Sequence, residues 1–211
     1  DLAVLDPDIG RCFSFALNDQ GQVFAQLAAF QEEVLTIDLD LDKPITREDL
    51  ETEEAIFQAL VLGIRDFVEK NRLERAFLGL SGGVDSAVVA VLAAKALGPD
   101  RVTAVAIPSR YSDPRSTTCA RELAENLEIH FKVVDLEPLL EAAEYTFGDI
   151  HVMGTTGENI QPRLRTMILM GYVNRHGGVL INTRNKTEES LGYSTLYGDT
   201  AGSLCPIADL T

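Results

Sequence analysis

Residues 76–97 read AFLGLSGGVDSAVVAVLAAKAL, and this stretch decides the fold. It begins with a short apolar run, Ala76–Leu80, that predicts a buried strand. It ends with Ala87–Leu97, a helical run that Gly98 and Pro99 bring to a close. The polar loop between the two runs therefore joins the carboxyl end of a strand to the start of a helix.

That loop contains residue types that bind phosphate. Gly82 and Gly83 allow a tight turn and a close approach to a ligand, and the following amides lie at a helix N-terminus. Ser81 and Ser86 add hydroxyl donors. Asp85 alone would repel phosphate, but it suits a divalent cation that bridges its carboxylate to phosphate oxygens. The alternative is an ordinary turn with serine and aspartate caps. The position directly after a strand favours a phosphate site.

Strands and helices alternate along the rest of the chain. Further strands are predicted at Val102–Ile107, Ile129–Val134 and Val179–Thr183, and helices at Pro114–Leu127, Leu136–Tyr145, Thr155–His176 and Asn185–Leu191, after an earlier helix that ends at Asn71. Units of this kind favour right-handed crossovers. The pattern predicts an α/β fold, a doubly wound and mostly parallel sheet with helices on both faces. Ligands of such sheets bind at the carboxyl ends of the strands.

Composition excludes several classes of function. The 211 residues include 33 acidic and 18 basic ones, and the net charge of −15 argues against nucleic acid or an anionic membrane as the main partner. The longest apolar run, Ala87–Ala94, is far shorter than the roughly 20 residues of a transmembrane helix. Cys12, Cys119 and Cys205 form no CxxC pair, so neither a disulfide framework nor a zinc site is expected. These features predict a cytoplasmic protein.

The first 42 residues differ from the rest. Three strands are predicted here, at Arg11–Leu17, Gln22–Leu27 and Glu33–Leu39, and an acidic linker follows at Asp38–Pro44. Three strands are too few to bury a sheet alone. We therefore expect residues 1–42 to be the tail of one domain and residues 43–211 to be a second domain, truncated at its C-terminus. The whole chain is expected to be a fragment.

Two more clusters of polar residues carry chemistry. Thr183 at a strand end can donate to a nucleotide, Glu188 can supply a second carboxylate for Mg²⁺, and Asp199 follows a glycine. Asn159 and Arg163 are four residues apart on one predicted helix face, where they suit a carboxylate or phosphate. A threonine cap, solvated charges and ordinary helix contacts are the alternatives, and for Asn159 and Arg163 the two interpretations are evenly balanced.

The three clusters together resemble a known family. The loop is similar to the SGGxDS loop of the PP-loop ATP pyrophosphatases. The full order SGGxDS, ENxQxRxR and TxNKSE…GYxTxYGDxxGxxxPIxD resembles the synthetase domain of NAD synthetases, over roughly residues 50–211. The strands before it are similar to the end of the nitrilase-like glutaminase domain that precedes this domain in glutamine-dependent NAD synthetases.

The resemblance implies a ligase that amidates deamido-NAD. Its nicotinate carboxylate attacks the α-phosphate of ATP, pyrophosphate leaves, and ammonia, supplied from glutamine in the full-length enzyme, then displaces AMP to give NAD. Mg²⁺ is the implied metal and a homo-oligomer the implied assembly. Implied catalytic residues are Asp85 and Asp199, and Asp85 and Glu188 are the implied metal ligands. Asn159, Arg163 and Glu188 would bind deamido-NAD. ATP would contact Gly79, Leu80, Ser81, Gly82, Gly83, Val84, Asp85, Ser86 and Thr183.

Some residues depart from the family pattern. Arg184 stands where glycine is usual, and Pro162 replaces alanine inside a predicted helix, where proline costs roughly 3 kcal/mol unless the helix kinks. A lysine that follows PIxD in the family would lie beyond Thr211. Other open interpretations are a different PP-loop amidotransferase such as GMP synthetase, an adenine-nucleotide-binding module without turnover, and a remnant that only mediates oligomer contacts.

Overall fold

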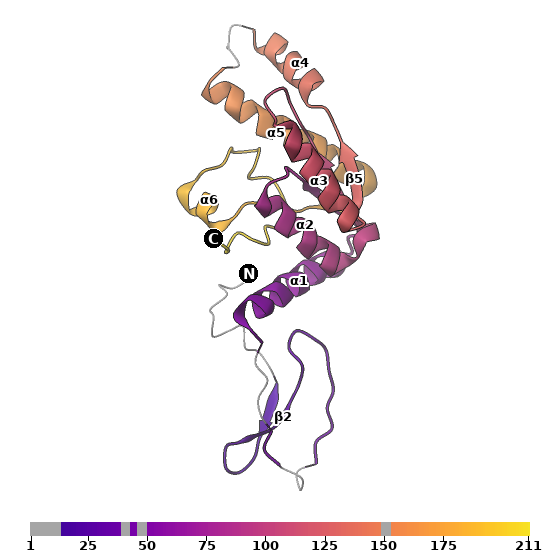
Figure 1. Cartoon of the computed structure of the whole chain (residues 1–211), viewed down its shortest axis with the longest axis vertical. Coiled ribbons are helices and arrows are strands. Elements are labelled where there is room, and N and C mark those ends of the chain that lie inside the picture. Colours follow the sequence, from indigo (N-terminus) through magenta and orange to yellow (C-terminus); the bar gives the residue numbers. More distant parts are fainter. Residues whose placement is uncertain (1–13, 39–42, 46–49, 149–152) are drawn as a thin grey trace. The chain divides into compact units, whose positions relative to one another are not determined.

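The computed structural model describes residues 14–38, 43–45, 50–148 and 153–211 (Figure 1). The chain divides into two units, Asp1–Leu62 and Gly63–Thr211. The division falls inside helix α1, Thr52–Lys70. Across the described residues, no helix is both long and apolar enough to cross a membrane.

The first unit contains a small hairpin. Strands β1, Phe15–Leu17, and β2, Val23–Gln26, pair antiparallel, with a register irregularity between Ala16 and Leu17. Asn18 shapes the turn, because its Oδ1 accepts the backbone N–H groups of Gln20 at 3.1 Å and of Gln22 at 2.8 Å. Such an amide-to-backbone turn is a local reason for the chain to reverse here. Residues 11–13 of the predicted first strand lie outside the described residues.

The predicted third strand at Glu33–Leu39 is wrong for residues 33–38. These residues form no strand, and Val34 is 97% exposed. An alternating apolar pattern makes a strand only where a neighbouring strand completes its hydrogen bonds, and residues 33–38 have no such neighbour among the described residues. Leu39 lies outside the described residues.

The second unit is built on a four-stranded parallel sheet in the order β5-β4-β3-β6. The strands are β3, Ala76–Gly79, β4, Val102–Ala106, β5, His130–Val133, and β6, Val179–Leu180. Ala76 of the central strand pairs with Val102 on one side and with Val179 on the other. The chain therefore runs outward from β3 to β5 and returns to add β6 on the opposite side of β3, as a doubly wound fold requires.

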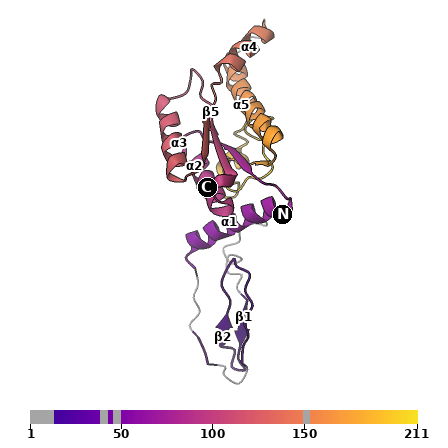
Figure 2. The ribbon, with the colours of Figure 1, turned by 90° about the vertical axis from the view of Figure 1, so that its right-hand side faces the viewer.

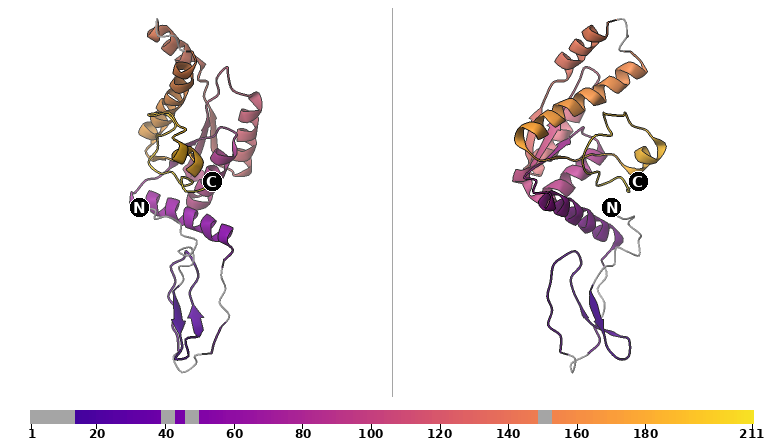
Figure 3. Two further views of the ribbon diagram at one scale, coloured as in Figure 1. Left: turned by 90° about the vertical axis from the view of Figure 1, so that its left-hand side faces the viewer. Right: turned by 180° about the vertical axis from the view of Figure 1, so that it is seen from behind.

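Helices cover both faces of this sheet. The helices that follow α1 are α2, Val84–Leu97, α3, Pro114–Asn126, α4, Glu137–Phe147, α5, Thr155–His176, and α6, Lys186–Leu191, with a short 3₁₀ helix, η2, at Pro99–Arg101. The two side views show α2 and α3 on one face and α5 on the other (Figures 2 and 3). The predicted fold class is confirmed.

The core under α5 holds that helix against the sheet. Leu169 of α5 packs in a buried cluster with Val105, Ile107, Leu136 and Leu180. These side chains come from strands, from the residues that follow them and from α5. Burial of apolar area of this kind is the main source of stability in such folds.

Two element boundaries differ from the sequence prediction for a physical reason. Helix α2 begins at Val84 and not at Ala87, because Gly83 is its N-cap and the helix starts inside the polar loop. Strand β6 ends at Leu180 and not at Thr183, because the next residue, Ile181, bridges to Leu204 and makes no further pair with β3. Helix α5 continues through Pro162 without a break.

Candidate functional site

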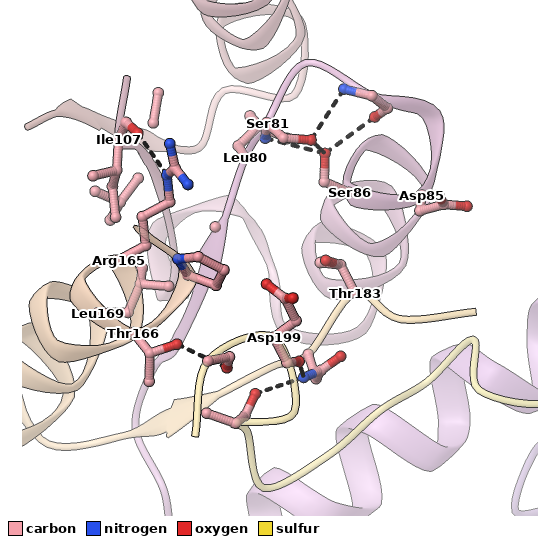
Figure 4. A pocket seen from close by; sticks show the side chains of 18 of the residues that line it. Leu80, Ser81, Asp85, Ser86, Ile107, Arg165, Thr166, Leu169, Thr183 and Asp199 are labelled. Carbon is pink, nitrogen blue, oxygen red and sulfur yellow. Dashed lines mark hydrogen bonds between the residues drawn. The ribbon is translucent and has the colours of Figure 1, made fainter. Parts of the chain in front are cut away.

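A cavity of about 410 Å³ opens where the strands of the parallel sheet end (Figure 4). Its lining comes from the loop after β3, the residues after β4, the start of α3, the middle of α5, the residues after β6, α6 and the turn at residues 198–201. The sequence-predicted residues among the lining are Gly79, Leu80, Ser81, Gly83, Asp85, Ser86, Thr183, Glu188 and Asp199. Parallel strands put their carboxyl ends at one edge, so residues far apart in the sequence meet there.

The loop after β3 is held in shape by its own two serines. The Ser86 Oγ accepts the Ser81 N–H at 3.2 Å and donates to the Gly83 carbonyl at 3.0 Å. The Ser81 Oγ lies 3.1 Å from the Ser86 Oγ and accepts the Gly83 N–H at 3.2 Å. Figure 4 shows the two hydroxyls pointing toward each other. Because Ser86 gives its proton to Gly83, Ser81 donates to Ser86, and both hydroxyl protons are used inside the loop.

A close approach to α3 fixes the loop from outside. Gly82 has a φ of +83°, and a Cβ atom there would lie 2.8 Å from the Cα of Ser116. Only glycine has neither the backbone penalty nor the clash. Gly82 and Val84 are not part of the cavity lining, and Val84 is 72% exposed. The loop therefore presents Ser81, Gly83 and Asp85 to the cavity while Gly82 packs against α3.

Three carboxylates line the cavity from three different segments. Asp85 comes from the first turn of α2, Glu188 from α6 and Asp199 from the turn after Gly198. Glu188 is also part of a capping box, in which its Oε2 accepts the Asn185 N–H at 3.1 Å and the Asn185 Oδ1 accepts the Glu188 N–H at 2.9 Å. This arrangement fixes the Glu188 side chain at the start of α6.

A magnesium ion fits this donor set only together with a nucleotide. Carboxylate oxygens are ligands that Mg²⁺ prefers, and the ion usually takes one or two of them plus substrate phosphates and water. Asp85 and Glu188 both line the cavity. In the described parts of the chain, no group of three or more His, Cys, Asp or Glu residues is able to hold a metal ion. The remaining ligands would therefore have to come from phosphate oxygens and water.

Arg165 is a cavity residue to which the sequence analysis gave no role. Its Nε donates to the Ile107 carbonyl at 3.0 Å, and its Nη2 lies 3.3 Å from the Gln161 Oε1. Burial lowers the pKa of the Arg165 guanidinium, and the negative charge of Asp199 opposes that shift. Arg165 thus brings positive charge to the cavity between the end of β4 and the Asp199 turn. Its position in the ENxQxRxR pattern is the sequence signal that could have marked it as a site residue.

Asn159 and Arg163 do not line this cavity. They line a separate hollow of about 320 Å³ with Phe147, Thr155, Thr156 and Ile160. The Asn159 Oδ1 accepts the Thr195 hydroxyl at 2.7 Å, and the Arg163 Nε donates to the Leu196 carbonyl at 3.0 Å. Both side chains therefore hold the segment that leads to Asp199. The structure separates them from Glu188, with which the sequence analysis grouped them.

The unusual Arg184 lies along the cavity wall. Its side chain is only 18% exposed, and its Nη1 pairs with the Glu189 carboxylate at 2.5 Å. Its Nε is buried and has no hydrogen-bond partner among the residues that the structure describes. The side chain is accommodated without displacing Thr183 or Glu188 from the lining.

Comparison with known proteins gives one consistent family. A family model described as NAD synthase matches residues 56–211. A relative from Rhodobacter capsulatus, named glutamine-dependent NAD(+) synthetase, is 41% identical over an alignment that covers 93% of this chain and 38% of the relative. The chain thus spans under two fifths of the length of the curated relatives it matches first. The match favours this family over the GMP synthetase alternative.

Solved structures agree. A glutamine-dependent NAD+ synthetase from Acinetobacter baumannii in complex with ADP aligns with a TM-score of 0.84 and 34% identity, over 90% of this chain and 38% of that one. An NMN synthetase from Francisella tularensis aligns with a TM-score of 0.71 and 34% identity, over 77% of this chain and 66% of that one.

Proposed function

The chain belongs to the NAD synthase family, and from this premise we propose that it carries the ATP-dependent amidating site of an NAD-forming ligase. The substrates would be ATP, deamido-NAD and ammonia, and the products NAD, AMP and pyrophosphate. The observation that carries the proposal is the cavity at the carboxyl ends of β3, β4 and β6, lined by a phosphate-type loop and three carboxylates. The relative with bound ADP supports a nucleotide as its occupant.

The proposed reaction has two steps. A carboxylate oxygen of the nicotinate group attacks the α-phosphorus of ATP, the bond to the β-phosphate oxygen breaks, and pyrophosphate leaves. Ammonia then adds to the carbonyl carbon of the resulting adenylate, loses a proton, and displaces AMP. No protein nucleophile is needed. The protein would contribute positioning and electrostatic stabilisation of charge on the phosphoryl oxygens.

The loop after β3 is assigned the phosphates of ATP. Its amide N–H groups and the start of α2 offer positive partial charge to an anion. We assign Asp85 and Glu188 to a magnesium ion, which supplies neutralising charge to the phosphates when bound. Thr183 is assigned to the nucleotide, and Asp199 to the region of the reacting carboxylate or ammonia. Arg165 joins the set as a further positive charge on the cavity wall.

The acceptor is assigned to the region where α5 meets the 195–199 segment. Asn159 and Arg163 line the second hollow there, and an amide beside a guanidinium suits a carboxylate or phosphate of deamido-NAD. Their bonds to Thr195 and Leu196 are the reason to expect that acceptor binding affects the Asp199 segment.

The assignment extends to the whole protein in a coarser way. We propose that residues 1–42 are the end of a nitrilase-like glutaminase domain and that residues 43–211 belong to the synthetase domain, in a cytoplasmic homo-oligomer. The relatives' names support glutamine as the ammonia source. The β1–β2 hairpin is consistent with the end of a larger β-containing domain.

The test measures AMP release from ATP and Mg²⁺ in the presence of ammonium. Reactions with deamido-NAD, with xanthosine monophosphate and with no acceptor are compared. AMP that appears only with deamido-NAD supports the proposal. AMP with xanthosine monophosphate would restore the GMP synthetase alternative. ATP binding without AMP from any acceptor would show a nucleotide-binding module without turnover.

A second acceptor is favoured by one observation. The Francisella tularensis neighbour is named NMN synthetase and is as similar in sequence identity, at 34%, as the ADP-bound NAD synthetase. Nicotinate mononucleotide has the same reacting carboxylate as deamido-NAD but lacks the adenylyl half. A fourth reaction with nicotinate mononucleotide therefore belongs in the same assay, and the ratio of kcat/KM for the two acceptors decides between them.

A further inference from the structure

Asn182 is a buried polar side chain that lines the cavity and whose amide is bonded at both its nitrogen and its oxygen. It lies two residues after the end of β6 and is only 7% exposed. Its Nδ2 donates to the carbonyl of Asp199 at 2.5 Å and to the carbonyl of Ala201 at 2.6 Å. Its Oδ1 accepts the Arg184 N–H at 2.8 Å, and the Cys205 thiol lies 3.4 Å away.

These bonds join two segments that both line the cavity. The Oδ1 side fixes the exit of β6, where Thr183 and Arg184 leave the sheet. The Nδ2 side fixes the turn on which Asp199 lies. A primary amide has two donors and an acceptor on one short rigid group, and no other side chain of this size offers the same set. One buried side chain therefore links the segment of Thr183 directly to the turn of Asp199.

Packing reinforces the contact. A Cβ atom on Gly202 would lie 2.8 Å from the Cβ of Asn182, so the turn lies directly against this side chain. On its other side the same turn is held by α5, because the Thr166 hydroxyl donates to the Gly198 carbonyl at 2.9 Å. The turn is thus clamped between the β6 exit and α5, while the Asp199 carboxylate itself stays at the cavity.

We propose that Asn182 is a positioning residue for the amidation step, which acts by holding the main chain of Asp199 and Ala201 so that the Asp199 carboxylate keeps a fixed place relative to Thr183. Asn182 itself does not act as an acid, a base or a ligand in the reaction. The inference rests on the proposed function, because it names the residue that organises the same site. Its loss should lower kcat and leave the binding of ATP by the loop after β3 largely intact.

The experiment compares Asn182→Ala with Val102→Ala. Val102 is fully buried at the amino end of β4, the sheet edge opposite the cavity, so its truncation weakens the core without touching the site. Each variant is measured for kcat and for the KM of ATP in the AMP-release assay. Hydrogen exchange of residues 198–203 is measured on the same samples without substrate.

We expect Asn182→Ala to lower kcat by about 10- to 100-fold, the range that a misplaced group produces, and to change the KM of ATP by no more than about threefold. Amides of residues 198–203 should exchange faster than in Val102→Ala, while residues 81–86 stay protected to the same extent. A merely structural role would lower the stability of both variants equally and would leave kcat and the local exchange of both alike. That result would overturn the proposal, as would faster exchange with an unchanged kcat.

Two further outcomes also test the proposal, namely a variant that does not fold and an unmodified chain without activity. If Asn182→Ala does not fold, Gly202→Ala replaces it, since the new methyl group pushes the same turn away from an intact Asn182, and the same loss of kcat is expected. If the unmodified chain releases no AMP with any acceptor, the proposed function fails separately. The exchange of residues 198–203 then decides alone, with equal rates in Asn182→Ala and Val102→Ala as the contrary result.

Discussion

Replacing Gly82 by alanine tests whether the loop after β3, residues 81–86, packs tightly against α3. Gly82 has a φ of +83°, and the new Cβ would lie 2.8 Å from the Cα of Ser116 and closer still to the Ser116 carbonyl oxygen. Both neighbouring atoms are backbone, so no flexible side chain is available to move aside. The loop or the first turn of α3 has to shift.

The magnitude follows from two separate costs. A residue with a Cβ loses about 1–3 kcal/mol in the sparsely populated regions of positive φ. Forcing an extra carbon into a packed position costs about 1–3 kcal/mol more. Gly98 separates the two terms, because its φ is +84° and a Cβ there would meet nothing within 4 Å. Gly98→Ala should therefore show only the first cost, and Gly82→Ala should be less stable than Gly98→Ala by about 1–3 kcal/mol.

The assay combines urea unfolding with calorimetric titration of ATP in the presence of Mg²⁺. Gly98→Ala should bind ATP like the unmodified chain. Gly82→Ala should bind it at least about tenfold more weakly, since a shift of the loop by a fraction of an ångström misaligns several N–H donors at once. Equal stability of the two variants would refute the tight packing against α3. Unchanged ATP affinity of a destabilised Gly82→Ala would refute the assignment of this loop to the phosphates.

Three other perturbations test separate parts of the site. Glu188→Gln should keep the α6 cap, because glutamine also accepts the Asn185 N–H. It should lower the rate of AMP release by at least about 100-fold through loss of a metal ligand. A loss of rate that comes with an equal loss in the free energy of unfolding would contradict this. A double-mutant cycle of Asn159→Ala with Thr195→Val should give a coupling of about 0.5–1.5 kcal/mol in urea unfolding, and additive effects would show that their 2.7 Å bond contributes nothing. Burial raises the pKa of the Cys205 thiol above its ordinary value of 9.0, so the folded state favours the protonated thiol; the stability this provides is complete below pH 9 and declines as pH rises toward the folded pKa. Urea midpoints of the unmodified chain should therefore fall above pH 9 relative to those of Cys205→Ala, and parallel pH profiles would exclude the effect.

Local sequence patterns predicted most of the elements of the fold. Alternating apolar strands and helical runs predicted β3, β4, β5 and the helices between them to within a few residues, because those elements bury continuous apolar faces. The sequence also predicted a phosphate site at residues 81–86, since glycines and small polar residues between a strand and a helix are typical of such a site. The failure at residues 33–38 has the same origin, because a pattern specifies a face but not the neighbouring strand that pairs with it.

The sequence did not predict which residues of the site lie together or which of their donors are already used. Asn159 and Arg163 share a helix face with the expected spacing, but which cavity that face meets depends on how α5 crosses the sheet. Ser81 and Ser86 were expected as free donors, and only the folded loop shows that their protons are used on each other and on Gly83.

The sequence by itself determined the family and the parallel sheet, and it predicted which residues suit phosphate and a metal ion, because those features depend on local composition and spacing. The tertiary structure alone decided which of them meet. Asn182 had no motif to mark it, and its importance comes from bonds to Asp199 and Ala201, 17 and 19 residues further along the chain. Contacts of that range depend on how strands and turns pack in space, and no local pattern in the sequence encodes them.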